Sequence, residues 1–288
     1  MKAGIVGLPN VGKSTLFNCL SNAKAQSANF PFCTIEPNIG VVNVPDSRLE
    51  RLESLVKPEK VVPATVEIVD IAGLVRGASK GEGLGNQFLS NIRETDAILH
   101  VLRCFDNDNI VHVDGSVDPI RDKETIDLEL QLKDLETVEK RLEKVSRAAR
   151  TGNKEAIKEQ EVLNQLQQGL SAATSVRALS ISDDDRLAYV KTMQLLTDKP
   201  VLYVCNVDES SAVNGNTYVN QVRQVAETEQ ADVLVLAVST EADINELDTY
   251  EERQLFLDDM GLTEPGAAKL IRAAYAMLNL HTYFTAGQ

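Results

Sequence analysis

Short apolar runs rich in β-branched residues alternate with amphipathic stretches along most of the chain. Both faces of the short runs are largely apolar, which is typical of buried strands. The predicted strands are Ala3–Val6, Val66–Asp70, Ile98–Leu102, Val201–Val207 and Val233–Val238. Helix-forming segments such as Lys13–Leu20 and Gly85–Arg93 lie between them. This alternation predicts an α/β fold with a mostly parallel sheet covered on both faces.

One long segment, Asp122–Gly169, breaks the alternation and is rich in Glu, Lys, Leu and Gln. Leucines recur in it every seven residues, and further apolar residues fill the same stripe. The stripe consists of Leu128, Leu132, Leu135, Val138, Leu142 and Val145, and it resumes at Leu163, Leu166 and Leu170. The pattern predicts two antiparallel helices that project from the sheet domain as a coiled-coil hairpin.

The turn of this hairpin is predicted at Thr151-Gly152-Asn153. Gly152 can end one helix in the left-handed conformation, and Asn153 can cap the next. Two interpretations of the hairpin stay open: it is a docking arm for a partner, or only a solvated helical element.

Composition narrows the class of protein. The 288 residues suit one large domain or a core with an insertion, and 43% of them are hydrophobic. No apolar run approaches the roughly 18–20 residues that span a bilayer. The N-terminus lacks the features of a signal peptide, and the four cysteines are scattered without metal-ligand spacing. We therefore expect a cytoplasmic protein with reduced thiols and no membrane contact.

The formal net charge of −14 opposes non-specific attraction to phosphate backbones. A contact with RNA would therefore need a local basic patch or a docking surface for a protein.

The strongest motif lies at residues 7–14, where G-L-P-N-V-G-K-S fits G-x-x-x-x-G-K-S between a predicted strand and a predicted helix. The backbone N–H groups of such a loop converge on phosphate oxygens at a helix N-terminus. Lys13 is expected to contact the β- and γ-phosphates, and Ser14 to bind Mg²⁺. The predicted nucleotide contacts here are Asn10, Val11, Gly12, Lys13, Ser14 and Thr15.

Two further positions are candidates for the same site. Asp70 ends a predicted strand in the motif D-x-x-G, where a carboxylate can hold a Mg²⁺-bound water and the N–H of Gly73 can reach the γ-phosphate. Thr34, in the loop N-F-P-F-C-T, is the candidate for a second hydroxyl on Mg²⁺.

These motifs, with the glycine-dense run Gly73–Leu89, resemble the Obg-type translation-factor GTPases, and most closely their YchF branch, the Obg-like ATPases. The resemblance extends over the whole chain. It implies a Ras-like P-loop NTPase domain interrupted by a helical insertion, a role in ATP hydrolysis as a conformational switch, and association with the ribosome through its large subunit.

The resemblance also suggests domain limits. Residues 1–120 and 186–276 would form the G domain, and 121–185 the inserted coiled coil. Family members usually continue into a C-terminal TGS domain. The chain ends where that domain would begin, so we expect it to be absent and residues 277–288 to be the linker towards it.

The base-recognition motif departs from the usual N-K-x-D of GTPases. Here Asn206-Val207-Asp208-Glu209 places Val207 at the lysine position and Glu209 at the aspartate position. Losing a buried bidentate contact with guanine costs about 2–4 kcal/mol of preference. The YchF branch has a similar N-x-x-E motif, and ATP is expected to bind more tightly than GTP. A one-residue slip that makes Asp208 the guanine reader is the alternative.

Two more sequence positions bear on the nucleotide. Ser239, after the last predicted strand, weakly matches the remaining base-contacting loop. Asn10 occupies a position that in related GTPases helps to hold K⁺, so a K⁺ ion beside Mg²⁺ is a hypothesis.

The catalytic position departs as well. Leu74 follows Gly73, where switch GTPases carry a glutamine that orients water, and leucine cannot form that hydrogen bond. Of the three histidines, His100 lies in an apolar strand and His281 near the C-terminus. His112 lies in a polar loop, where we expect it to be exposed and mobile, and the family implicates the matching histidine in catalysis.

Two competing functions stay open at this level. The chain could be a binding module in which nucleotide is mainly structural and hydrolysis negligible. It could also be a metabolic kinase, although the D-x-x-G and Asn206 motifs would then be coincidences.

Overall fold

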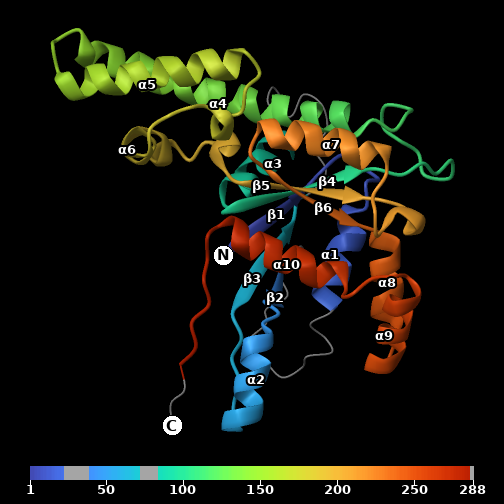
Figure 1. The fold of residues 1–288 in the computed structure, drawn as a ribbon. Helices are drawn as coiled ribbons and strands as arrows, with labels where there is room; N and C mark the ends of the chain where they lie inside the picture. The colour runs from blue at the N-terminus through green and yellow to red at the C-terminus, as the bar shows by residue number, and fades with distance from the viewer. Residues whose placement is uncertain (23–38, 72–83, 286–288) are drawn as a thin grey trace.

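A six-stranded sheet forms the centre of the computed structural model, which describes residues 1–22, 39–71 and 84–285 (Figure 1). The strand order is β2-β3-β1-β4-β5-β6, and every neighbouring pair is parallel except β2 with β3. The strands are β1 Lys2–Val6, β2 Ile39–Asn43, β3 Thr65–Asp70, β4 Ala97–Arg103, β5 Val201–Asn206 and β6 Asp232–Leu236. The predicted α/β class with a mostly parallel sheet is confirmed, and so are the five predicted strands.

Strand β2 was not predicted from the sequence. Among the described strands it lies at the edge of the sheet, where it pairs with β3 alone, and its second residue is Gly40. A short edge strand with an interior glycine has a weak intrinsic preference for the extended state, so its pairing with β3 decides its structure.

Helices cover both faces of the sheet. In Figure 1, α3, α4 and α7 lie on one side, and α1 and α10 on the other. The helices are α1 Lys13–Asn22, α2 Ser47–Val56, α3 Leu84–Arg93, α4 Pro119–Ala149, α5 Lys154–Ser171, α6 Asp183–Asp185, α7 Thr217–Thr228, α8 Val238–Glu246, α9 Tyr250–Asp259 and α10 Gly266–Met277. Five short helical turns complete the described chain: η1 Val176–Ala178, η2 Arg186–Val190, η3 Lys191–Met193, η4 Leu196–Asp198 and η5 Glu209–Ser211.

Helices α4 and α5 form the predicted hairpin, and its turn has the predicted chemistry. Gly152 has a φ of +84°, in the left-handed region that favours glycine. The side chain of Asn153 accepts a hydrogen bond from the N–H of Ala156 at 3.1 Å and so caps α5. Both local predictions are confirmed.

The apolar stripe of α4 is placed differently from the heptad prediction. Leu128 is 49% exposed, whereas Ile126 and Leu130 are buried against the sheet. The first half of α4 packs on the sheet, so Ile126 and Leu130 face the sheet domain. Only the second half of α4 pairs with α5. The coiled-coil pattern therefore holds from Leu135 onwards and fails at Leu128 and Leu132, which are exposed.

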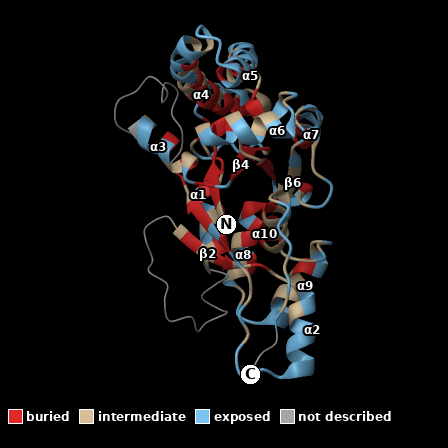
Figure 2. Cartoon of the chain, turned by 90° about the vertical axis from the view of Figure 1, so that its left-hand side faces the viewer, coloured by how far each residue is buried: buried red, intermediate tan, exposed pale blue. Residues whose placement is uncertain are grey.

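Two hydrophobic cores result, and Figure 2 shows buried residues both at the sheet and between the hairpin helices. The sheet core extends into α4 as far as Leu130, and the second core extends beyond α5 to Val190 and Leu195. The change from one core to the other falls between Leu130 and Leu135 on α4, and again between Leu195 and Leu196. The expected domain limits at 121 and 185 stay predictions. A single continuous helix serves both cores, which is why no sequence signal marks the division.

A buried group of charged side chains fastens the base of the hairpin to the sheet domain. The Lys123 ammonium lies 2.6 Å from the Asp127 carboxylate, and Arg177 contacts both Asp127 at 3.4 Å and Glu229 at 3.1 Å. The hydroxyl of Tyr203 on β5 donates to Glu229 at 2.7 Å. These contacts tie α4, η1, β5 and α7 together.

In the described part of the chain, we find no helix with the length and apolar character needed to cross a bilayer.

Candidate nucleotide site

The loop at residues 7–12 connects β1 to α1, and besides Gly7 it contains two residues with positive φ angles. Asn10 has a φ of +62° and Gly12 a φ of +101°. A Cβ atom at Gly12 would lie 2.5 Å from Nδ2 of Asn206, so no other residue fits there without displacing this side chain. The motif thus ends at the first turn of α1, where unpaired backbone N–H groups face an incoming anion.

Lys13 begins α1 and lies folded against the loop. Its ammonium donates to the backbone oxygen of Leu8 at 2.7 Å, and the side chain is buried. Burial lowers the pKa of Lys13 to about 8, and the nearby Asp70 carboxylate opposes this shift. The site therefore holds a partly desolvated cation that an anionic ligand would stabilise.

Ser14 and Asp70 come together across the loop, as the predicted metal site requires. The Ser14 hydroxyl donates to Oδ2 of Asp70 at 3.2 Å. The other carboxylate oxygen of Asp70, Oδ1, is buried without a hydrogen-bond partner among the described residues. A buried, unpartnered carboxylate oxygen is costly unless a cation or water satisfies it. Ser14 and the neighbouring Thr15 are exposed on the ligand side of α1.

Thr34, Gly73 and Leu74 lie outside the described residues, so their expected roles stay predictions.

On the base side, Asn206 ties the phosphate loop to the loop that follows β6. Its side-chain amide donates to the oxygen of Val11 at 2.9 Å, and its oxygen accepts from the N–H of Val238 at 3.0 Å. Ser239, one residue further on, is exposed in the first turn of α8. Asn206 therefore holds two predicted parts of the site together.

The residues that follow Asn206 separate into buried and exposed positions. Val207 is 2% exposed and packs in the sheet core. Its expected place at the nucleotide stays a prediction. Glu209 is exposed at the start of η5.

Asp208 already has hydrogen-bond partners within its own turn. Its carboxylate accepts from the Ser210 hydroxyl at 2.6 Å and from the N–H of Ser211 at 2.9 Å. The hydrogen bond from Ser210 is the main cause that lowers the pKa of Asp208. Asp208 thus acts as the N-cap of η5, a role that competes with base recognition.

His112 differs from the sequence expectation. It is only 8% exposed, and its Nε2 lies 2.8 Å from Oδ2 of Asp122 in the first turn of α4. Its Nδ1 accepts from the N–H of Asp114 at 3.1 Å. Because Nδ1 is an acceptor, Nε2 carries the hydrogen and donates a hydrogen bond to Asp122. The expected exposure of His112 is wrong, since two partners hold the ring inward.

The loop of His112 nevertheless touches the phosphate loop. The side-chain amide of Asn10 donates to the backbone oxygen of Val111 at 3.1 Å. Asp122, the buried partner of His112, was missed in the sequence because nothing in its local pattern distinguishes it from other acidic residues in a helix N-terminal turn. Arg121 also contacts Asp122, at 3.1 Å.

Comparisons with known proteins decide the family. Residues 2–146 match the model of the 50S ribosome-binding GTPases. The chain is 52% identical over 290 residues to the ribosome-binding ATPase YchF of Bacillus subtilis, and 54% identical over 286 residues to that of Escherichia coli O157:H7. These alignments cover 100% and 99% of the chain, and 79% and 78% of the relatives. The chain belongs to the YchF family.

The solved structure of the Schizosaccharomyces pombe YchF GTPase agrees. It matches with a TM-score of 0.86 and 37% identity, over 100% of this chain and 78% of that one. The resemblance inferred from the sequence motifs is therefore confirmed, both for the YchF family and for its G-domain fold.

His100 of this YchF-family chain is a core residue, as expected. It is buried on β4 beside Tyr203, with 5.6 Å between the ring centres. Burial lowers the pKa of His100 to about 4, so it stays neutral at pH 7.

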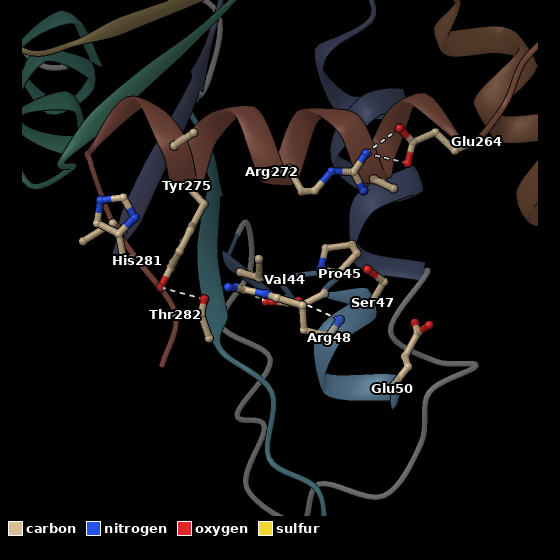
Figure 3. Close-up of a pocket in the computed structure, with 14 residues that line it drawn as sticks. Val44, Pro45, Ser47, Arg48, Glu50, Glu264, Arg272, Tyr275, His281 and Thr282 are labelled. Atoms are coloured by element: carbon tan, nitrogen blue, oxygen red, sulfur yellow. Dashed lines mark hydrogen bonds and ion pairs between the residues drawn. The ribbon is translucent and has the colours of Figure 1, made fainter. Parts of the chain in front are cut away.

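A separate cavity of about 710 Å³ lies away from the phosphate loop (Figure 3). It is lined by the start of α2, by α10 and by the segment after α10. Arg272 pairs with Glu264 there, and the hydroxyl of Thr282 lies 3.4 Å from that of Tyr275. None of the predicted nucleotide contacts lines this cavity, so we do not assign the nucleotide to it.

The two hydrogen bonds of the Asn206 side chain are expected to stabilise the protein. Asn206→Ala should lower the free energy of unfolding by about 2–4 kcal/mol, because the oxygen of Val11 and the N–H of Val238 lose their partners. Urea unfolding of the nucleotide-free protein measures it. Asn220→Ala, at an exposed position of α7, is the matched control and should change stability by no more than about 0.5 kcal/mol. Equal stability of the two variants would contradict the proposed tie.

Proposed function

We propose that this chain is a Mg²⁺-dependent ATPase that works as a conformational switch on the ribosome and prefers ATP to GTP. The main observation behind this proposal is that Lys13, Ser14 and Asp70 lie together at the N-terminus of α1. The buried ammonium of Lys13 and the unpartnered carboxylate oxygen of Asp70 lie beside the proposed phosphate-binding loop. Membership of a family whose named relatives are ribosome-binding ATPases supports the same function.

The residues present fit Mg²⁺. Ser14 would bind the ion through its hydroxyl, Asp70 through a water molecule, and Thr34 through a second hydroxyl. Hard oxygen donors of this kind are those that Mg²⁺ prefers. When bound, the ion neutralises charge on the β- and γ-phosphates during transfer. K⁺ near Asn10 would add positive charge at the same phosphates.

The protein's own groups then bind and orient the triphosphate. The N–H groups of residues 10–15 and the Lys13 ammonium hold its phosphates, and the N–H of Gly73 would contact the γ-phosphate. Because Leu74 cannot orient the attacking water, we assign this task to His112, which must leave Asp122 to perform it. The contact between Asn10 and Val111 offers a route by which nucleotide binding could move the His112 loop.

Base preference provides the direct test of this proposal. Calorimetry on the purified protein should give a lower Kd for ATP than for GTP, because Glu209 replaces the aspartate that reads guanine. If GTP bound tenfold more tightly than ATP, the proposal that Glu209 removes the preference for guanine would be wrong.

The substitution Asp208→Asn tests the alternative in which Asp208, and not Glu209, occupies the guanine-reading position. Asparagine preserves the N-cap of η5 but removes the charge, so the fold should be kept. We expect both nucleotide affinities to change by less than about threefold. A selective loss of GTP affinity would instead assign guanine recognition to Asp208.

The proposed setting is the cytoplasm, with the large ribosomal subunit as partner and a contact to RNA through a local basic patch. A second candidate is a nucleotide-stabilised binding module without useful catalysis, which the exposed, projecting hairpin favours. Single-turnover hydrolysis with excess protein distinguishes the two: a negligible rate that His112→Ala leaves unchanged would favour the binding module.

A further inference from the structure

The outer end of the α4–α5 hairpin is basic, although the chain as a whole is acidic. Between residues 144 and 154, which we call the hairpin tip, four side chains are basic and none is acidic, whereas the formal net charge of the chain is −14. The four are Lys144, Arg147, Arg150 and Lys154, and all are exposed. The tip thus carries the opposite sign of charge to the rest of the molecule.

The hairpin stem differs from the tip because its basic residues have acidic partners. Lys133 pairs with Glu136 at 2.8 Å, Arg141 with Glu159 at 2.6 Å, and Lys158 with Asp185 at 3.1 Å.

At the tip, only Arg147 is paired, with Glu143 at 3.0 Å, and both side chains are more than 70% exposed. Such a pair contributes little and separates easily. Lys144, Arg150 and Lys154 form no ion pair with any residue in the ranges 1–22, 39–71 and 84–285.

The hairpin tip lies far from the sheet domain, so the negative potential of that domain is weak there. The hairpin extends beyond the sheet domain, with its turn at the outer end (Figure 1). Residues 135–149 of α4, whose apolar side chains pack in the hairpin core, span roughly 22 Å at 1.5 Å per residue. The screening length at physiological salt is about 8 Å, so the negative field of the body is largely lost at the tip.

The tip is also rigid and open. Val145 and Ala156 anchor it in the hairpin core, so presenting the four charges requires little additional ordering of the backbone. A Cβ atom built on Gly152 would have no neighbour within 4 Å, which leaves the turn accessible to a large ligand.

From these observations we propose that the hairpin tip binds the phosphate backbone of RNA. Arginine pairs with phosphate through two parallel N–H donors and lysine acts as a point charge. A protein partner would ordinarily require aromatic or aliphatic anchors, and the tip exposes none larger than alanine. The inference rests on the proposed ribosome association and identifies the place of its RNA contact.

The test compares two variants that each lose four positive charges, from different parts of the hairpin. The tip variant carries Lys144→Gln, Arg147→Gln, Arg150→Gln and Lys154→Gln. The matched stem variant carries Lys133→Gln, Lys140→Gln, Arg141→Gln and Lys158→Gln.

Binding to a fluorescent RNA stem-loop of about 20 nucleotides is measured between 50 and 200 mM salt. The slope of log K against log salt should fall in magnitude by about 3 in the tip variant, with a tenfold or greater loss of affinity at low salt. The stem variant should bind nearly as the wild type does.

Two further measurements keep the outcomes distinct. Circular dichroism and thermal unfolding should show that both variants fold, and both should retain wild-type ATP hydrolysis, because the tip is far from Lys13. Loss of cosedimentation with purified ribosomes in the tip variant alone would support the proposal. Unchanged RNA binding by the folded tip variant would overturn it, and if ribosome binding were nevertheless lost, the tip would contact a ribosomal protein. Absent hydrolysis in the wild type would instead defeat the ATPase proposal and leave the RNA result standing.

Discussion

Replacing Lys13 with alanine is expected to lower the affinity for Mg²⁺–ATP by roughly 30- to 3000-fold. The ammonium is buried beside the phosphate loop, so it meets the phosphates with little water between them. Removing one partner of a buried charge pair costs about 2–5 kcal/mol, and each 1.4 kcal/mol is a factor of about ten. Calorimetric titration with ATP measures the loss.

Two variants make this result specific. Lys13→Met keeps most of the apolar stem without the charge and should lose as much affinity as Lys13→Ala, which excludes a packing effect. Lys154→Ala removes an ammonium from the exposed hairpin tip and should bind ATP as the wild type does. Wild-type retention of the triphosphate by a folded Lys13→Met variant would refute the assignment of the phosphate site.

The pH dependence of binding follows from the same residue. The pKa of Lys13 in the free protein is about 8, and bound phosphates favour its charged form and so raise that pKa. Below pH 8 the ammonium is already present, whereas above it the free protein must take up a proton on binding. The affinity should therefore fall by about tenfold between pH 7 and 9, and Lys13→Met should lack this dependence.

Replacing His112 with alanine is expected to slow single-turnover ATP hydrolysis by about 10²- to 10⁴-fold, the range typical of a lost general acid or base. Nucleotide affinity should stay within about threefold of the wild type, since His112 in this structure contacts Asp122 and Asp114 rather than the phosphate loop itself. Rapid-quench measurements with protein in excess separate hydrolysis from product release.

His281→Ala is the matched control for that experiment, because His281 is exposed at the cavity of Figure 3, away from the phosphate loop. It should hydrolyse ATP at the wild-type rate. Equal rates for wild type and His112→Ala, with hydrolysis clearly measurable, would show that another group orients the water.

The strand, loop and helix that carry the proposed phosphate site were predictable because the information for them is local. Residues 7–14 carry the glycine, lysine and serine that a phosphate loop needs, and the strand before them and the helix after them are strongly patterned. Asp70 could be added because it ends a predicted strand next to β1, and the ends of parallel strands meet at one edge of a sheet. Gly152 and Asn153 were predictable for the same reason, since a turn depends on its own residues.

Contacts between distant segments were not predictable in this way. The burial of His112 depends on Asp122, ten positions later, and the edge strand β2 depends on β3. Leu128 is exposed because the first half of α4 packs against the sheet and not against α5. A repeat of seven leucine positions does not specify which element a helix packs against.

The sequence by itself determined the fold class, the phosphate loop with its lysine and the helical hairpin, because each depends on periodicity or on residues close together in the chain. Only the tertiary structure decided where the two hydrophobic cores divide α4, that Val207 packs in the core, and that His112 is held by Asp122. It also showed that the basic residues of the stem pair with acidic neighbours, whereas Lys144, Arg150 and Lys154 of the hairpin tip form no ion pair with any described residue. These features arise from packing between segments far apart in the chain, where burial and charge pairing depend on the partner that the fold supplies.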